Sequence, residues 1–333
     1  MSYVRHFKTV SLADIAQVGG KNASLGHMIQ HLSLSGIKVP TGFAITVKAY
    51  RQHLEQNDLF VVIQKMLAPL TLTSSLSEVQ FVGKKIRTFI EKAPLDAAII
   101  AAITNAYQDL CNEVGSKACI VAVRSSATIE DSPDASCAGQ QESFLYRQGI
   151  DQVIAAYKKS IASLFTDRAI IYRNQKGIDH LSIGISVGVQ QMVHAEKACS
   201  GIMFTVDPES GFKDVIVISS SYGVGESLVK GEVVPDEFHV FKKTLHTGHD
   251  AIIKKSCGSK KIKRIFSKKG SGTIKSAVAL ADRLQFSLTH DQIHGLARIA
   301  QQIEDHYTVI FGTKTYMDIK WAQDAHDGCF YIV

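Results

Sequence analysis

The spacing of the apolar residues changes near residue 180, and this change constrains the fold more than any other feature. In earlier stretches, such as 25–32 and 48–118, apolar residues recur every three or four positions, which indicates amphipathic helices. Later runs such as ISVGVQQMV, SGIMFTVDP and DVIVISSS are short and bounded by Gly, Pro, Asp or Ser, which is typical of strands. A last helix is predicted to begin after Thr289, with Gln292 as its capping-box partner. The order predicts an α+β fold, rich in helices first and in strands later.

Composition narrows the class of protein. A chain of 333 residues with 45% hydrophobic content is long for one core, which favours two lobes. The chain has no apolar run of about 18 residues, so we expect no membrane-spanning helix, and its start lacks the apolar centre of a signal peptide. Six cysteines without a CxxC pair predict a reduced, cytoplasmic protein without a structural zinc site. The net charge of +6 is weak support for an anionic partner such as a nucleotide.

The stretch VAVRSSATIEDSPDASCAGQQESFL joins a buried strand to a long polar segment. We expect the strand to end at Arg124, whose guanidinium can donate two parallel hydrogen bonds to a phosphate. Ser125, Ser126 and Thr128 would add hydroxyls, and Gly139 would let the backbone approach a ligand closely. The alternative is a solvated surface loop behind a capping arginine, and composition leaves both interpretations open.

The sequence GGKNASLG places Lys21 in a glycine turn before a predicted helix. Such a turn can bring the backbone N–H groups of a helix start close to an anion. It is not a Walker A loop, because that motif requires Ser or Thr after the lysine and this chain has Asn22. The alternative is an ordinary helix-start turn with a solvated lysine.

Three later stretches carry weaker signals. GVQQMV, which contains Gln190, is predicted to be a strand whose amide side chains face either a ligand or solvent. In YMDIKWAQ, Asp318 and Lys320 alternate onto one strand face, where a carboxylate can bind Mg²⁺. The basic tract 254–269 has a single aromatic residue, Phe266, which favours a solvated hairpin over a nucleic-acid surface.

Eight stretches together resemble the phosphoenolpyruvate synthase (pyruvate, water dikinase) family. They are, in chain order, VGGKNASLG, VPTGFAIT, AVRSSATIEDSPDASCAGQQESF, SLFTDRAIIYR, GIMFTVDPESGF, GVGESLVKGEVVPDEF, GSKKIK and DIKWA. The resemblance runs from near residue 10 to the end of the chain. The long Arg124 segment is also similar to that of the related pyruvate phosphate dikinase and rifampin phosphotransferase.

The resemblance implies an ATP-grasp fold, with two lobes and the nucleotide cleft between them. Residues 1–190 would form the first lobe, with a phosphate-binding loop at 124–143, and residues 191–333 the second. The family converts ATP, pyruvate and water to AMP, phosphoenolpyruvate and phosphate. Its ATP-grasp part phosphorylates a histidine on a swivelling domain, and a barrel domain then phosphorylates pyruvate. ATP and Mg²⁺ are the expected ligands, and neither nucleic acid nor a membrane is an expected partner.

Site roles also follow from the resemblance, residue by residue. Lys21 and Arg124 would contact the ATP phosphates and take part in catalysis. The other positions have one role each: Gly139 and Ser143 in the phosphate loop, Gln190 near the adenine, and Asp318 at the Mg²⁺–phosphate site.

Some positions depart from the family pattern. Lys320 stands where the family has a glutamate that ligates metal or nucleotide, and an ammonium cannot ligate Mg²⁺. The segment 306–316 is longer than the corresponding family turn, and the 333 residues do not contain the phosphohistidine and barrel domains. We therefore expect the ATP-binding, phosphate-donating part of such a synthase, unable to run the full reaction by itself. The alternative is a truncated, catalytically impaired remnant that binds a nucleotide or a partner.

Overall fold

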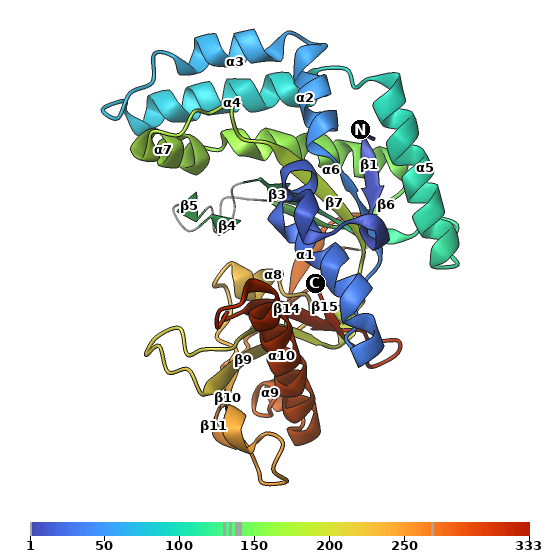
Figure 1. Cartoon of the computed structure of the whole chain (residues 1–333), viewed down its shortest axis with the longest axis vertical. Coiled ribbons are helices and arrows are strands. Elements are labelled where there is room, and N and C mark those ends of the chain that lie inside the picture. The colour runs from blue at the N-terminus through green and yellow to red at the C-terminus, as the bar shows by residue number, and fades with distance from the viewer. Residues whose placement is uncertain (1, 129–130, 133–134, 137–141, 268–269) are drawn as a thin grey trace. The chain divides into compact units, whose positions relative to one another are not determined.

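The computed structural model describes residues 2–128, 131–132, 135–136, 142–267 and 270–333. The chain forms two compact units. The first unit contains residues 1–31, 41–192 and 270–272, and the second contains residues 32–40, 193–269 and 273–333. Each unit combines helices with an antiparallel sheet, in agreement with the α+β class expected from the sequence (Figure 1).

The first unit is built on a five-stranded antiparallel sheet. Its strands, in spatial order, are β1 (Val4–His6), β2 (Gly42–Ile45), β7 (Ile185–Gln191), β3 (Ile120–Ala127) and β6 (Ser143–Gln148). Two short strands, β4 (Asp131–Ser132) and β5 (Ala135–Ser136), pair with each other between β3 and β6 along the chain. The first unit therefore contains a five-stranded sheet in addition to the helices that its sequence predicts.

Helices lie on both faces of this sheet (Figure 1). On one face, Val121, Val123, Val187 and Val189 are fully buried in a core shared with α2 to α6. On the other face, the residues between these valines lie against α1. The helices are α1 (Ile15–His31), α2 (Val47–Glu55), α3 (Leu59–Leu67), α4 (Leu76–Lys92), α5 (Ala97–Glu113), α6 (Ile150–Ala162) and α7 (Asp167–Lys176), with the 3₁₀ turns η1 (Phe7–Thr9), η2 (Leu12–Asp14) and η4 (Ser163–Phe165).

Local sequence determines where these helices begin and which face they bury. The Ser75 side chain accepts a hydrogen bond from the Glu78 N–H, and the Glu78 carboxylate accepts one from the Ser75 N–H, which forms a capping box at the start of α4. Apolar residues at helical spacing then turn one side of α4 toward the core.

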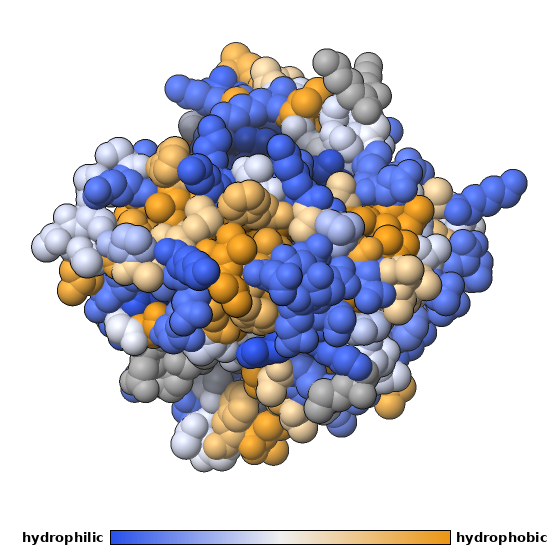
Figure 2. Space-filling model, turned by 90° about the horizontal axis from the view of Figure 1, so that it is seen from above, coloured by the Kyte–Doolittle hydropathy of each residue, from blue (hydrophilic) through white to orange (hydrophobic). Residues whose placement is uncertain are grey.

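Some apolar side chains remain exposed, among them Val61 and Phe81. Figure 2 shows apolar residues interspersed with hydrophilic ones on the face that it presents.

The second unit is built on a six-stranded antiparallel sheet. Its strands, in spatial order, are β11 (Ile252–Ser256), β10 (Asp236–Phe241), β9 (Val215–Tyr222), β8 (Cys199–Phe204), β14 (Asp318–Gln323) and β15 (Phe330–Ile332). A separate hairpin pairs β12 (Ile262–Phe266) with β13 (Thr273–Ala277). The chain's single tryptophan, Trp321, is buried in this unit, where only 1% of its surface is exposed.

One long helix packs on this second sheet. Helix α10 (His290–Phe311) contacts β9 and β10, and it begins with the predicted capping box between Thr289 and Gln292. The short helical segments are α8 (Glu226–Val229), α9 (Leu280–Arg283), η3 (Ser33–Ser35), η5 (Ala195–Lys197) and η6 (Lys242–Thr244). No helix among the described residues is both long and apolar enough to cross a membrane.

Candidate functional site

Three of the residues selected from the sequence lie on one face of the first sheet. Arg124 of β3 is paired with Gly188 of β7 on one side and with Ser143 of β6 on the other. Gln190 lies two residues along β7 from Gly188, opposite Ala122. Residues directly opposite one another in antiparallel strands share a face, as do residues two apart in one strand. Arg124, Ser143 and Gln190 therefore face the same side of the sheet, the side covered by α1.

The glycine turn that holds Lys21 packs against the same face. Helix α1 departs from helical geometry at Gly19, where φ is 74° and ψ is 164°. A Cβ atom on Gly19 would lie 2.3 Å from the carbonyl oxygen of Ser126, so only glycine permits this approach. The Asn22 N–H donates to Ser126 Oγ at 3.4 Å, and Asn22 Nδ2 donates to Ser186 Oγ at 3.1 Å. These contacts fix the turn to β3 and β7, and Lys21 is exposed on it.

Arg124 lies within β3 and not at its end, which corrects our expectation. The strand continues through Ser125 and Ser126 to Ala127 and stays paired with β7. Ser125 and Ser126 are almost completely buried, because small hydroxyl side chains fit between the sheet and the elements around it. Ser125 Oγ donates to the Glu142 carbonyl at 3.4 Å, and Ser126 Oγ is the acceptor for the α1 turn. These two hydroxyls therefore form hydrogen bonds within the first unit, and we do not assign them to a ligand.

The charge of Arg124 lies in a poorly solvated position. Its side chain is partly buried, and burial lowers the pKa of its guanidinium because the charged form is less well hydrated there. Among the described residues, none forms a hydrogen bond or an ion pair with this guanidinium. An anion with two parallel acceptor oxygens, such as a phosphate, would satisfy its donors and compensate its charge.

The other first-unit positions differ in accessibility. Ser143 is exposed at the first position of β6. Only 2% of the surface of Gln190 is exposed to solvent, so its side chain is packed inside the unit. Gly139 lies outside the described residues.

In the second unit, Asp318 and Lys320 share one face of β14, as their alternation predicts. Ile319 and Trp321 are buried on the opposite face. The register between β14 and β8 is regular over this stretch. Lys320 Nζ lies 3.9 Å from Asp318 Oδ2, and the side chains are 39% and 54% exposed. The lysine therefore lies beside the carboxylate whose predicted role is metal binding.

This pair does not fit a Mg²⁺ ion on its own. Mg²⁺ requires near-octahedral oxygen coordination. The exposed face of β14 offers one carboxylate and one ammonium, which repels a cation. The group of three potential ligand residues that occurs among the described residues is elsewhere in this unit and does not include Asp318.

The stretch GVGESLVKGEVVPDEF has a structural role that sequence reasoning did not identify. Arg264 of β12 donates to both carboxylate oxygens of Glu232, at 3.0 and 3.1 Å, and lies 3.4 Å from Glu226. The hydrogen bonds from Arg264 lower the pKa of Glu232 to about 2. These contacts attach the β12–β13 hairpin to the segment around α8.

The basic tract 254–269 includes one strand of the predicted hairpin, but one of its lysines is not solvated. Lys260 is fully buried and donates a hydrogen bond to Asp236, which is also fully buried. Asp236 accepts a further hydrogen bond from the Gly258 N–H at 2.9 Å. The stretches GVGESLVKGEVVPDEF and GSKKIK are therefore joined by a buried ion pair. Lysine and aspartate are usually exposed, so composition does not indicate this contact.

Residues 15–333 match the family model of the pyruvate phosphate dikinase AMP/ATP-binding domain. The chain therefore belongs to this family of nucleotide-binding domains.

Several relatives in this family are phosphoenolpyruvate synthases, as the sequence resemblance indicates. The chain is 45% identical to the phosphoenolpyruvate synthase of Neisseria meningitidis over 335 residues, which cover 100% of this chain and 41% of the relative. It is 47% identical to that of Aquifex aeolicus over 316 residues (95% and 37%), and 43% identical to that of Escherichia coli over 330 residues (98% and 40%). The chain spans about two fifths of the length of these curated relatives.

Proposed function

We propose that the first unit binds ATP, with Lys21 and Arg124 on its phosphates. The chain would then donate a phosphate from ATP to a histidine of a phosphohistidine domain. In the whole protein this step would contribute to forming AMP, phosphoenolpyruvate and phosphate from ATP, pyruvate and water. An ATP-grasp fold with lobes at 1–190 and 191–333, in a cytoplasmic protein, belongs to the same proposal.

The observation that supports this proposal most is that Arg124 and the turn holding Lys21 both lie on the α1 side of the first sheet. Lys21 lies on a glycine turn that is fixed against β3 by the contacts of Gly19 and Asn22 with Ser126. Arg124 lies in β3 itself, two residues from Ser126 and facing the same side.

This arrangement suits phosphoryl transfer, in which the protein mainly positions the groups and neutralises charge. Lys21 would contribute a point charge, and Arg124 a planar pair of donors. Gly139 and Ser143 would belong to the phosphate loop, and Gln190 would lie near the adenine. Because Gln190 is packed inside the unit, a contact with adenine requires its side chain to become accessible.

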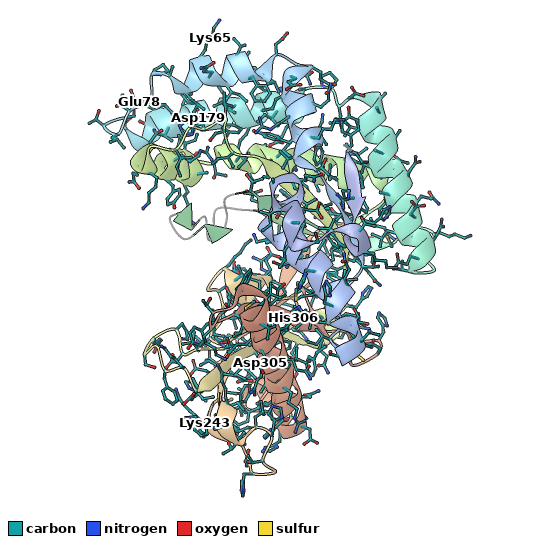
Figure 3. The ribbon with its side chains drawn as sticks, in the orientation of Figure 1. Lys65, Glu78, Asp179, Lys243, Asp305 and His306 are labelled. Carbon is teal, nitrogen blue, oxygen red and sulfur yellow. The ribbon has the colours of Figure 1, made fainter. Side chains whose placement is uncertain are left out.

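The experiment that tests the proposal is calorimetric titration of the chain with ATP and Mg²⁺. Lys21→Ala and Arg124→Ala should each weaken ATP binding by about ten- to a hundred-fold, because each removes a charged hydrogen bond worth roughly 1.5–3 kcal/mol. Lys65→Ala is the matched control, since Lys65 is an exposed lysine on α3 of the same unit (Figure 3). Unchanged ATP affinity in both site variants would rule out this site.

A second candidate function is nucleotide binding without phosphate transfer. The position of Lys320 favours it, because this lysine lies beside Asp318 where the resembling family has a glutamate. In that case Asp318 is partly neutralised by Lys320 and binds Mg²⁺ poorly. ATP would still bind through Lys21 and Arg124.

Lys320→Glu should make ATP binding more dependent on Mg²⁺ than it is in the native chain. The substitution replaces an ammonium by a second carboxylate on the same strand face, and such a pair can bind the ion together with phosphate oxygens. The measurement is ATP affinity with Mg²⁺ and with EDTA, in the native chain and in the variant. Lys243→Glu serves as the control for charge reversal, because Lys243 is an exposed lysine of the same unit. Equal Mg²⁺ dependence in the native chain and Lys320→Glu would show that position 320 is not at the nucleotide.

A further inference from the structure

Three potential metal ligands converge in the second unit, at a place that the proposed function does not use. Asp250 lies in the connection between β10 and β11, and His290 and His294 lie in the first turns of α10. Asp250 Oδ2 is 3.1 Å from His290 Nε2, and Asp250 Oδ1 is 3.2 Å from His294 Nε2. The three ligand atoms all lie within 4.8 Å of one another.

The local structure holds these side chains in place. The capping box of Thr289 and Gln292 fixes the start of α10, so that His290 and His294, four residues apart, project from one side of the helix. Their ring centroids are 4.7 Å apart. On the loop, the Ile252 N–H donates to Asp250 Oδ1 at 3.0 Å, which orients the carboxylate. The cluster therefore joins a helix start to a fixed loop end.

We propose that Asp250, His290 and His294 form a binding site for Zn²⁺. Imidazole nitrogen and carboxylate oxygen are the ligand types that Zn²⁺ takes in proteins. Ligand atoms about 2.0–2.1 Å from a tetrahedral Zn²⁺ lie about 3.3–3.4 Å from each other. The two histidine–aspartate distances, one to each oxygen of Asp250, are close to this spacing, so side-chain rotations would bring a carboxylate oxygen and both imidazoles onto one ion.

The exposure of the cluster indicates that the fourth coordination position of a bound ion would be open to water. His294 is 9% exposed, whereas the side chains of His290 and Asp250 are 48% and 59% exposed. A metal bound here would be anchored on its buried side by His294 and open to water on the other side. The ion would connect the β10–β11 loop to α10 and stabilise the folded second unit, since a ligand that binds only the folded state shifts the folding equilibrium toward it.

The first unit contains a natural comparison for this site. His27 and His31 of α1 are also four residues apart, and their ring centroids are 4.3 Å apart. Among the described residues, however, no third ligand side chain completes a group with them. If spacing of two histidines were sufficient for tight Zn²⁺ binding, both pairs would bind.

The test is competition for Zn²⁺ between the full chain and a chromophoric chelator. We expect one tightly bound equivalent in the native chain, and a loss of affinity of at least about tenfold in each of Asp250→Asn, His290→Gln and His294→Gln, since even outer-shell changes cost ten- to a hundred-fold. Asp291→Asn and His31→Gln are matched controls and should keep native affinity. Co²⁺ should give the absorption bands of a tetrahedral site, and Mg²⁺ should not displace Zn²⁺.

Two results would overturn this inference. One is a native chain that takes up no Zn²⁺ in competition with the chelator. The other is uptake that His31→Gln weakens as much as the three ligand substitutions do, which would indicate non-specific histidine binding. Because Asp250 and His290 are largely exposed, their variants should fold, and thermal unfolding with and without Zn²⁺ would confirm this. The native melting temperature should rise with Zn²⁺, and that of Asp250→Asn should not.

Discussion

Replacing Asp236 by alanine should destabilise the second unit by about 3–5 kcal/mol, because the substitution leaves the ammonium of Lys260 buried without its counter-ion. Both residues are fully buried. Asp236 also accepts hydrogen bonds from the Gly258 N–H at 2.9 Å and from the N–H and Oγ of Ser287, each at 2.7 Å. Urea unfolding followed by fluorescence of Trp321, the only tryptophan, would measure the change in this unit.

An exposed ion pair of the same unit is the control for this measurement. Lys243 Nζ lies 2.6 Å from Asp214 Oδ2, and the Lys243 side chain is 69% exposed. Figure 3 labels this lysine. Lys243→Ala should cost less than about 1 kcal/mol, since water solvates either charge alone. The double variant Asp236→Leu/Lys260→Met should be less destabilised than the sum of its single variants. A cost below about 1 kcal/mol for Asp236→Ala would contradict the importance of the buried pair.

Gly19→Ala should weaken ATP binding at least as much as Lys21→Ala, by about ten- to a hundred-fold or more. Alanine at φ 74° and ψ 164° costs about 1–3 kcal/mol of backbone strain. In addition, its Cβ would lie 2.3 Å from the Ser126 carbonyl oxygen, which forces the turn away from β3. Displacement of the turn would move Lys21 relative to Arg124. Calorimetric titration with ATP measures the effect.

Gly149→Ala is the control that separates the effect of backbone strain from the effect of displacing the turn. Gly149 has nearly the same conformation, φ 83° and ψ 154°, and a Cβ atom placed on it meets nothing within 4 Å. Gly149→Ala should therefore lower the stability of the first unit and leave ATP affinity unchanged. If Gly149→Ala and Gly19→Ala reduced ATP affinity equally, a general loss of stability would explain both, and the turn would have no special role.

Features encoded within a few residues could be predicted from the sequence. The start of α10 follows from Thr289 and Gln292, which are three positions apart and satisfy each other's backbone groups. The shared face of Asp318 and Lys320 follows from the two-residue period of a strand. The Gly-Gly-Lys pattern predicts a turn whose backbone approaches a ligand closely, and in the structure Gly19 of this turn approaches Ser126 of β3.

Features that depend on distant parts of the chain could not be predicted in this way. Asn22 and Ser126 are 104 residues apart, so their hydrogen bond forms only when α1 packs on the sheet. The extension of β3 beyond Arg124 depends on its pairing with β7, about 60 residues later in the chain. Lys260 is likewise buried only because Asp236, 24 residues away, compensates its charge. A run of small hydroxyl residues indicates a loop, and a run of lysines indicates a solvated hairpin, on composition alone; tertiary packing buries Ser125, Ser126 and Lys260 instead.

The most direct test of the nucleotide site is to compare ATP with adenosine as ligands of the native chain and of Arg124→Ala. If Arg124 binds phosphate, the substitution should weaken ATP binding about ten- to a hundred-fold. It should leave adenosine binding nearly unchanged, because adenosine has no phosphate for Arg124 to contact. Native affinity for ATP should also exceed that for adenosine by at least this factor. Equal losses for the two ligands, or no loss for ATP, would contradict a phosphate-binding role for Arg124 and with it the proposed site.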